Sequence, residues 1–391
     1  MKPRRRAQKE TVLHEEYTIL LSLVGAQVGG VPATAEIEDY KTLILLARQH
    51  SVLNILYHAL KDDPALPSEY RTVLEGRLFS SVQQQLEQER ETARIRKALD
   101  EAGIRHLLMK GALIRALYPA PEMRTSCDVD FYYDKKARPQ MDALFASLGY
   151  EKEEADPNHT AYKQGRVSVE MHHNLLTDIP RIDKYYADLW DRLIPLDGHG
   201  YAMRDEDFYI YHVVHTMKHF TVAGTGIRSV LDTFVFLRAK TELDMTYLRA
   251  ELEKIGLWEF HLSLVALAEV WFGGGKMPAD LADVSAYVLG SGTYGTTGNA
   301  VTNRAAAGRG GKLGFALRRA FPSYHFMAEK YPSLRRFPVA LPFYWLYRIL
   351  RALFGKDNRV GAELSAAQNA DAALGEQLAG VMRRVGLDGY R

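Results

Sequence analysis

Apolar positions recur at helical spacing over the first hundred residues. Between residues 43 and 60, Leu, Ile and Val return every three or four positions, which places them on broad helix faces. The stretch Ser80–Ala102, rich in Gln, Glu, Arg and Ala, predicts one long amphipathic helix with Gly103 as its C-terminal cap. Its inward positions are expected at Leu86, Ala93, Ile95 and Leu99. Residues 12–103 are therefore predicted to form an N-terminal helical segment.

The pattern changes at residue 104, where short apolar runs alternate with turn residues. The predicted elements are a strand at Ile104–Met109, a helix at Ala112–Leu117, a strand at Cys127–Tyr133, a helix at Lys136–Leu148, and a hairpin of Thr160–Lys163 with Val167–His173. Along the last strand Val167, Val169 and Met171 point to one face, and the polar residues between them point to the other. This predicts an α/β core, with a mixed sheet and helices on its faces, over residues 104–200.

From residue 201 onward the pattern is helical again. Helices are predicted at Asp205–Phe220, Ile227–Lys240, Leu243–Ile255 and Trp258–Phe272. Residues 201–289 are predicted to be a helical domain, and residues 290–312, rich in Gly, Thr, Ala and Asn, a flexible loop. A C-terminal helical segment is predicted over residues 313–391, with Ala362–Val385 as the final helix.

The composition is that of an ordinary globular protein, with 25% charged and 47% hydrophobic residues. The net charge of +2 gives no argument for a nucleic-acid or membrane partner. A single cysteine, Cys127, excludes an internal disulfide and a cysteine-rich zinc site, and a cytoplasmic location is expected. No run reaches about 18 uncharged apolar residues, so no transmembrane helix is predicted. Residues 1–11 are predicted to be a disordered basic tail.

The segment Arg335–Phe354 combines Trp, Tyr and Arg residues. This mixture is the chemistry of a helix that lies at a membrane surface. The alternative is an ordinary packed helix with Arg side chains on its rim, and we favour it.

Asp128 and Asp130 lie two residues apart in a predicted strand, so their carboxylates point to the same face. Asp is depleted in strands, and two of them in one strand need a reason. Paired carboxylates suit Mg²⁺ (or Mn²⁺), which combines one or two carboxylates with substrate phosphates. We therefore predict a metal site here, with a solvated strand end as the alternative. Cys127 is expected to point to the opposite face as a small core residue.

Lys110 and Gly111 stand between the first predicted strand and the helix that follows it. Helix N-termini attract anions through their free N–H groups and the helix dipole. A phosphate-binding turn that faces a metal-binding pair is the minimal equipment for nucleotide chemistry.

An ordered set of motifs resembles the poorly characterised bacterial nucleotidyltransferase-like family, a subgroup of the nucleotidyltransferase superfamily. The matching residues are Met109-Lys110-Gly111, Tyr118-Pro119, Arg124, Asp128-Val-Asp130, Glu170-Met-His172, His215-Thr-Met-Lys218-His219 and Arg228-Ser-Val-Leu-Asp232. The resemblance covers about residues 40–350. It implies a nucleotidyltransferase-like mixed sheet core that is flanked by N-terminal and C-terminal helical segments.

The resemblance also implies residue roles. Asp128, Asp130 and Glu170 would be the catalytic and metal-binding carboxylates, with Glu170 activating the attacking hydroxyl or helping to hold the metal. Nucleotide binding is implied for Lys110, Gly111, Arg124, His172, His215, Lys218 and His219. Lys110 and Arg124 are the candidate triphosphate contacts, because Arg offers a bidentate fork to phosphate. For Arg124 the alternative is a salt bridge to Asp128 or Asp130.

His215, Lys218 and His219 share one helix face, at positions i, i+3 and i+4. That face could line the nucleotide cleft or pack against another helix. His-x-x-x-His also resembles a zinc-binding pair, but the Glu of the metalloprotease pattern is missing. Arg228 and Asp232, one turn apart, are expected to form a structural ion pair.

The reaction implied by the resemblance is transfer of a nucleoside monophosphate from an NTP to an acceptor hydroxyl, with release of pyrophosphate. Ala112 follows Gly111 where most active members carry Ser or Gly, so no hydroxyl is available there and Lys110 could supply a point charge instead. The alternatives are phosphoryl transfer from the same site, or a catalytically weak nucleotide-binding or interaction protein. The acceptor could be a small molecule, a peptide, a protein or an RNA end.

Overall fold

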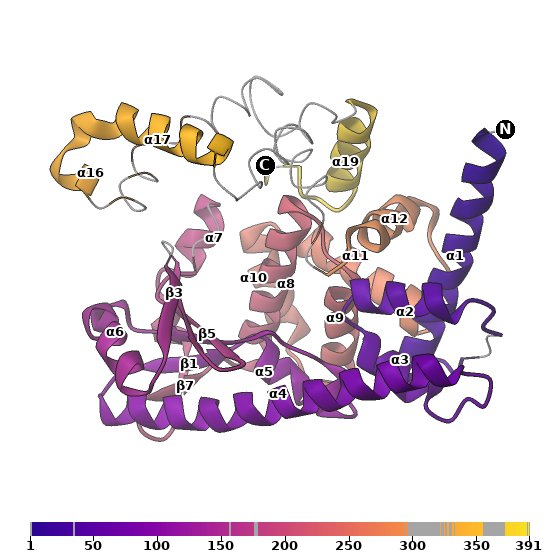
Figure 1. Ribbon diagram of the computed structural model, residues 1–391, viewed down its shortest axis with the longest axis horizontal. Helices are drawn as coiled ribbons and strands as arrows, with labels where there is room; N and C mark the ends of the chain where they lie inside the picture. Colours follow the sequence, from indigo (N-terminus) through magenta and orange to yellow (C-terminus); the bar gives the residue numbers. More distant parts are fainter. Residues whose placement is uncertain are drawn as a thin grey trace.

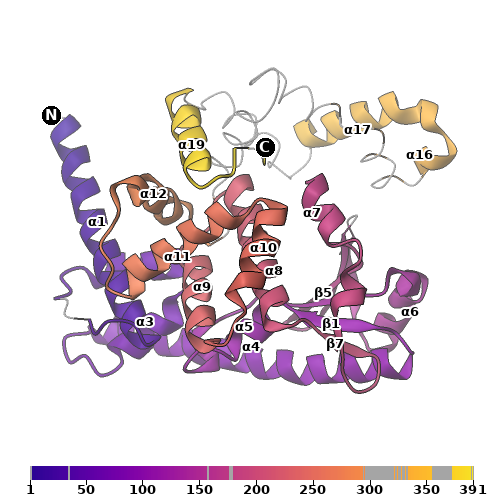
Figure 2. The same ribbon diagram turned by 180° about the vertical axis from the view of Figure 1, so that it is seen from behind.

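The computed structural model describes residues 2–33, 36–155, 158–175, 179–293, 333–354 and 372–388, together with residues 295, 321, 324, 327, 331 and 390. The chain begins with four helices, α1 (Lys2–Gln27), α2 (Tyr40–Gln49), α3 (Leu53–Leu60) and α4 (Ser68–Glu101). Helix α4 runs beneath the sheet at one end and beside α3 at the other, so it joins the two halves of the molecule (Figures 1 and 2).

The sheet has the strand order β3-β4-β5-β2-β1-β7-β6. Its strands are β1 (His106–Met109), β2 (Asp128–Tyr133), β3 (Glu151–Ala155), β4 (His159–Gln164), β5 (Val167–His172), β6 (Ile194–Pro195) and β7 (Gly200–Ala202). Strand β2 pairs in parallel with β5 and antiparallel with β1, and β1 pairs in parallel with β7. The predicted α/β fold class, a mixed sheet with flanking helices, is therefore confirmed.

The two faces of the sheet differ in chemistry. Val129, Phe131 and Tyr133 of β2 lie in one buried cluster with Ile95 and Leu99 of α4. The alternation predicted for the last strand is confirmed, since Val167, Val169 and Met171 lie in the same cluster. The opposite face therefore carries the carboxylates of β2 and β5.

Short helices connect the strands. They are α5 (Gly111–Arg115), α6 (Arg138–Ser147) and α7 (Pro180–Tyr185). The helix expected at Ala112–Leu117 is thus limited to five residues, and its dipole is correspondingly small. The strands β3, β6 and β7 were not predicted, because Glu151–Ala155 is mostly charged and the other two are only two or three residues long.

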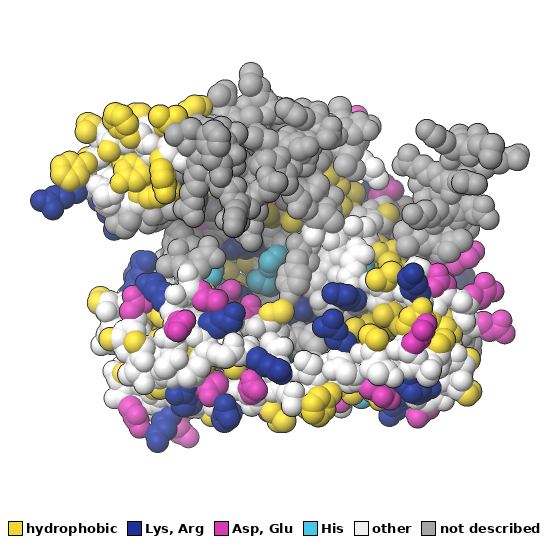
Figure 3. Space-filling view, in the orientation of Figure 1, with side chains coloured by type: hydrophobic (Ala, Val, Ile, Leu, Met, Phe, Trp, Pro, Cys, Tyr) yellow, Lys and Arg dark blue, Asp and Glu magenta, His cyan; other side chains and the backbone are white. Residues whose placement is uncertain are grey.

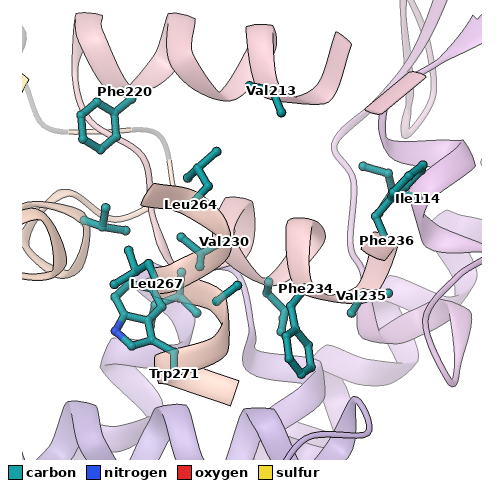
Figure 4. Close-up of a cluster of buried hydrophobic side chains, with 14 of the residues drawn as sticks. Ile114, Val213, Phe220, Val230, Phe234, Val235, Phe236, Leu264, Leu267 and Trp271 are labelled. Carbon is teal, nitrogen blue, oxygen red and sulfur yellow. The ribbon is translucent and has the colours of Figure 1, made fainter. Parts of the chain in front are cut away.

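The second half of the molecule is helical. It contains α8 (Asp205–Val222), α9 (Ile227–Ala239), α10 (Met245–Ile255), α11 (Trp258–Phe272) and α12 (Ala282–Ser291). Figure 4 shows Val230 and Phe234 of α9 in a cluster of buried side chains with Leu264, Leu267 and Trp271 of α11. The helices predicted between residues 205 and 272 are confirmed, with small shifts at their ends.

Helix α1 includes residues 2–11, and the predicted disorder of the basic tail stays a prediction. Two of the inward positions predicted for α4 are wrong. Leu86 and Ala93 are exposed, because the buried face of this part of α4 carries Gln88, Glu91, Ile95 and Leu99, at spacings of three and four residues, and the two predicted positions lie on another face.

The C-terminal part described here contains α16 (Ser333–Arg336), α17 (Leu341–Phe354) and α19 (Ala372–Arg384). In α17, Tyr344 and Trp345 pack on a small cluster, whereas Phe343 and Leu346 are 74% and 55% exposed. The favoured packed-helix interpretation therefore holds for one face of α17, and contact with a membrane surface stays a prediction.

No described helix combines the length and the hydropathy that crossing a membrane requires. The predicted loop 290–312 is described only in part. Gly290 and Ser291 are the last two residues of helix α12, and residues 294 and 296–312 lie outside the described residues. The same holds for residues 362–371 of the predicted final helix.

Three buried histidines give the fold a pH dependence. Burial lowers the pKa of His50, His212 and His261 from 6.5 to about 4. Since the unfolded chain binds protons more readily than the folded one, their contribution to stability is complete above pH 6.5 and is lost as the pH falls towards 4. Urea unfolding at several pH values should show the free energy of unfolding decreasing across this window. A constant value from pH 7 to pH 4.5 would contradict the assignment.

Candidate functional site

A cavity of about 330 Å³ lies between the sheet and the helical half, and every site residue predicted from the sequence lines it. Its walls come from the turn after β1, from β2 and β5, and from α8 and α9. Figure 3 shows histidine side chains within a hollow near the centre of the face in view. The structure therefore brings the predicted residues together, while their individual roles stay predictions.

The carboxylates converge because of strand register. Asp130 of β2 is the partner of Glu170 in the parallel neighbour β5, and Asp128 lies two residues before Asp130 on the same face. Burial, reinforced by the carboxylates of Asp130 and Glu170, raises the pKa of Asp128. The site thus concentrates negative charge in a poorly solvated place, where a cation is stabilised.

Lys110 supplies a positive charge to this cluster. Its Nζ donates to Asp130 Oδ1 at 2.5 Å and lies 3.8 Å from Glu170 Oε2. Burial alone would lower the pKa of Lys110, but Asp130 outweighs burial and raises it, so the ammonium stays charged. The residue has φ of +49°, in the left-handed region that side chains rarely adopt. A strained backbone conformation of this kind is retained only where the surrounding structure enforces it, and such residues are often found at functional sites.

Gly111 is needed for close packing. A Cβ at this position would lie 2.7 Å from Arg124 Nη1 and 2.9 Å from Ser126 Oγ. Any other residue would therefore require the side chains of Arg124 or Ser126 to shift, and Arg124 is held by its buried pair with Asp232.

Two histidines extend the carboxylate cluster. His172 Nε2 lies 2.9 Å from Asp130 Oδ1 and 3.2 Å from Glu170 Oε2. His159 of β4 is the register partner of His172, and His159, Glu170 and His172 have ligand atoms within 4.8 Å of one another. His159 was not among the predicted site residues, although pairing of the predicted hairpin would have brought it beside His172.

Arg124 has a different partner from either predicted one. Its Nε and Nη2 donate to Asp232 of α9 in a bidentate pair, both at 2.8 Å, and Tyr118 donates to the same carboxylate at 2.7 Å. The expected salt bridge to Asp128 or Asp130 is thus replaced by a buried pair that joins the loop before β2 to the helical half. Asp232 was expected to pair with Arg228, and its contact with Arg124 was not predicted from the sequence.

His215 and His219 face the cavity from α8. Their Nε2 atoms lie 3.2 Å apart. Burial, followed by the charge of Lys110, lowers the pKa of both residues, that of His219 to about 4. Among the described residues, the side chains whose ligand atoms lie close enough together to hold a metal are His159, Glu170 and His172. This group contains neither His215 nor His219, so the zinc interpretation lacks a third ligand, and it does not contain Asp128 or Asp130 in their present positions.

Cys127 does not lie in the core. Its thiol is exposed and the residue lines the cavity, because β2 begins only at Asp128 and strand alternation does not extend to it.

The Arg124–Asp232 pair predicts a measurable loss of stability. Asp232→Asn should lower the free energy of unfolding by about 3–5 kcal/mol, because it leaves the buried guanidinium without its counter-charge. The matched control is Asp283→Asn, in an exposed pair with Arg384, where the change should stay within about 1 kcal/mol. Urea unfolding of both variants gives the comparison, and equal losses would contradict a special position for Asp232.

A comparison with family models places these residues in context. Residues 37–273 match the model of a family described as an uncharacterised nucleotidyltransferase, and this span contains the whole sheet and every predicted site residue. Searches of curated proteins and of solved structures return no match. Because the match extends over more than half of the 391 residues, the chain belongs to this uncharacterised nucleotidyltransferase family.

Proposed function

We propose that the protein transfers a nucleoside monophosphate from an NTP to an acceptor hydroxyl and releases pyrophosphate. The observation that carries the proposal is the convergence of Asp128, Asp130 and Glu170 in one cavity of a chain that belongs to a nucleotidyltransferase family. The cavity volume of about 330 Å³ is within the range of small-molecule sites.

The three carboxylates are chemically suited to a hard divalent cation, since Mg²⁺ and Mn²⁺ prefer carboxylate oxygens. Asp128, Asp130 and Glu170 would hold the metal once Asp130 exchanges its contact with Lys110 for it. The raised pKa of Asp128, caused by burial and by the other two carboxylates, supports a cation at this position. When bound, the metal would polarise phosphate oxygens and offset the negative charge of the triphosphate.

The protein's own groups would perform the remaining tasks. The acceptor oxygen forms a bond to the α-phosphorus, the bond from that phosphorus to the bridging oxygen breaks, and pyrophosphate leaves with that oxygen. Glu170 would serve as the third metal ligand or as the base that accepts the hydroxyl proton, and its side chain, 27% exposed, is more accessible to an acceptor than that of Asp130, 4% exposed. His172 would orient Glu170, and Lys110 would neutralise negative charge that develops on the phosphate.

The proposal predicts loss of metal-dependent nucleotide binding when the carboxylates are neutralised. Asp128→Asn and Asp130→Asn keep the side-chain shape but remove the charge, and each should weaken Mg²⁺-dependent NTP binding by about tenfold or more. Calorimetric titration of ATP, GTP, CTP and UTP, with Mg²⁺ and with EDTA, measures the effect. Asp142→Asn, in an exposed pair with Lys152 outside the cavity, is the control. Unchanged binding in both cavity variants would overturn the metal assignment.

Product analysis separates the proposed reaction from its alternatives. Nucleotidyl transfer releases pyrophosphate, whereas phosphoryl transfer releases a nucleoside diphosphate. With candidate small molecules, peptides, proteins and RNA ends as acceptors, we expect pyrophosphate. A nucleoside diphosphate, or binding without turnover for every acceptor class, would contradict the proposal.

A further inference from the structure

At its second end, the part lined by α8 and α9, the cavity gathers positive charge, and the carboxylate that the described residues contribute there, Asp232, is paired with Arg124. Lys218 of α8 and Arg228 of α9 line it, and Lys110 approaches from the sheet side. After burial, the charges of Lys110, Lys218 and Arg228 lower the pKa of His219, and no carboxylate contributes to that shift. Asp232 lies nearby, but its charge is offset by Arg124. An anion entering this end would therefore meet cations and, among the residues that the structure describes, no uncompensated carboxylate.

The same end contains the N-terminus of α9. This helix has 13 residues and no acidic residue in its first turn, and its N-cap residue, Gly226, has no side chain that could cap it. The N–H of Ile227 is bound by His50, and the following N–H groups of the first turn have no side-chain cap. Its N-terminal N–H groups and dipole favour negative charge. The helix is held firmly in place, because Val230, Leu231 and Phe234 are buried in the helical core (Figure 4).

Gly226, at the N-cap of α9, lets other groups approach the helix start. A Cβ here would lie 2.7 Å from His50 Nδ1 and 2.7 Å from the backbone N of Thr293. His50 Nδ1 accepts from the N–H of Ile227 at 3.1 Å. Glycine at this position therefore brings Thr293, which follows α12, against the first turn of α9.

Hydroxyl groups complete the lining. Thr225 and Ser229 are joined by a hydrogen bond of 2.6 Å between their hydroxyls, and both line the cavity. Thr293 lines it as well; it is only 8% exposed, and its Oγ1 has no hydrogen-bond partner. A buried hydroxyl without a partner is rare in folded proteins and calls for an explanation, such as a ligand that accepts from it.

We propose that this end, formed by Lys218, Thr225, Arg228, Ser229 and Thr293 with the start of α9, binds the terminal phosphates of the NTP. This inference deepens the proposed function and rests on it for the identity of the ligand. Cationic side chains, hydroxyl donors and a helix N-terminus are the groups that recognise a polyphosphate. The triphosphate would then extend from the carboxylates on the sheet to α9, so that pyrophosphate leaves towards the helical half.

The direct test uses inorganic tripolyphosphate and the full chain in EDTA, so that no divalent metal takes part. We expect calorimetric titration to show binding that weakens as salt increases, and orthophosphate to bind more weakly than tripolyphosphate because it is shorter. Arg228→Met should weaken tripolyphosphate binding by about tenfold or more, and Thr293→Val combined with Ser229→Ala by about tenfold. Thermal unfolding of each variant verifies that it folds.

Matched controls make the outcome specific. Thr221→Val removes a hydroxyl of α8 that donates to Met217 O and does not line the cavity, so binding should be unchanged. Asp128→Asn should retain metal-free tripolyphosphate binding, which separates this inference from the metal assignment. If tripolyphosphate does not bind, or if folded Arg228 and Thr293/Ser229 variants bind it as tightly as the wild type, the inference is overturned.

Discussion

The buried ion pair between Arg124 and Asp232 is the constraint on which the cavity depends. It links the loop that leads into β2, and hence the aspartate strand, to the middle of α9. Because both groups are almost fully buried, neither can separate from the other without a large desolvation cost. The pair therefore fixes the helical half at a set position over the sheet, and the cavity is the space between the two.

Charge is separated along that cavity. The carboxylates of β2 and β5 lie at the sheet, and the cations, hydroxyls and helix N-terminus lie at α8 and α9. Lys110 stands between the two groups, with its ammonium on Asp130 and its backbone in a strained conformation. Such an arrangement suits a ligand that carries a metal at one end and phosphates at the other, because each part meets the opposite charge in a poorly solvated space.

Local patterns together with the family resemblance predicted the carboxylate cluster. Two-residue alternation placed Asp128 with Asp130 and Glu170 away from the core, and the family resemblance joined the two strands. Contacts between distant segments could not be predicted in this way. The partner of Arg124 is Asp232, 108 residues further along the chain, and Thr293 reaches the cavity only because Gly226 admits it. Likewise, which face of α4 is buried depends on tertiary packing, because Gln88 and Glu91 are buried whereas Leu86 is exposed.

If one cavity holds a divalent metal at the sheet and the triphosphate between the sheet and α9, both should be visible together in a crystal structure with Mn²⁺ and α,β-methylene ATP, recorded with anomalous scattering from manganese. We expect the manganese signal at Asp128 and Asp130, and the terminal phosphates at Arg228, Ser229 and Thr293. Manganese at His215 and His219, or phosphates bound outside the cavity, would contradict it.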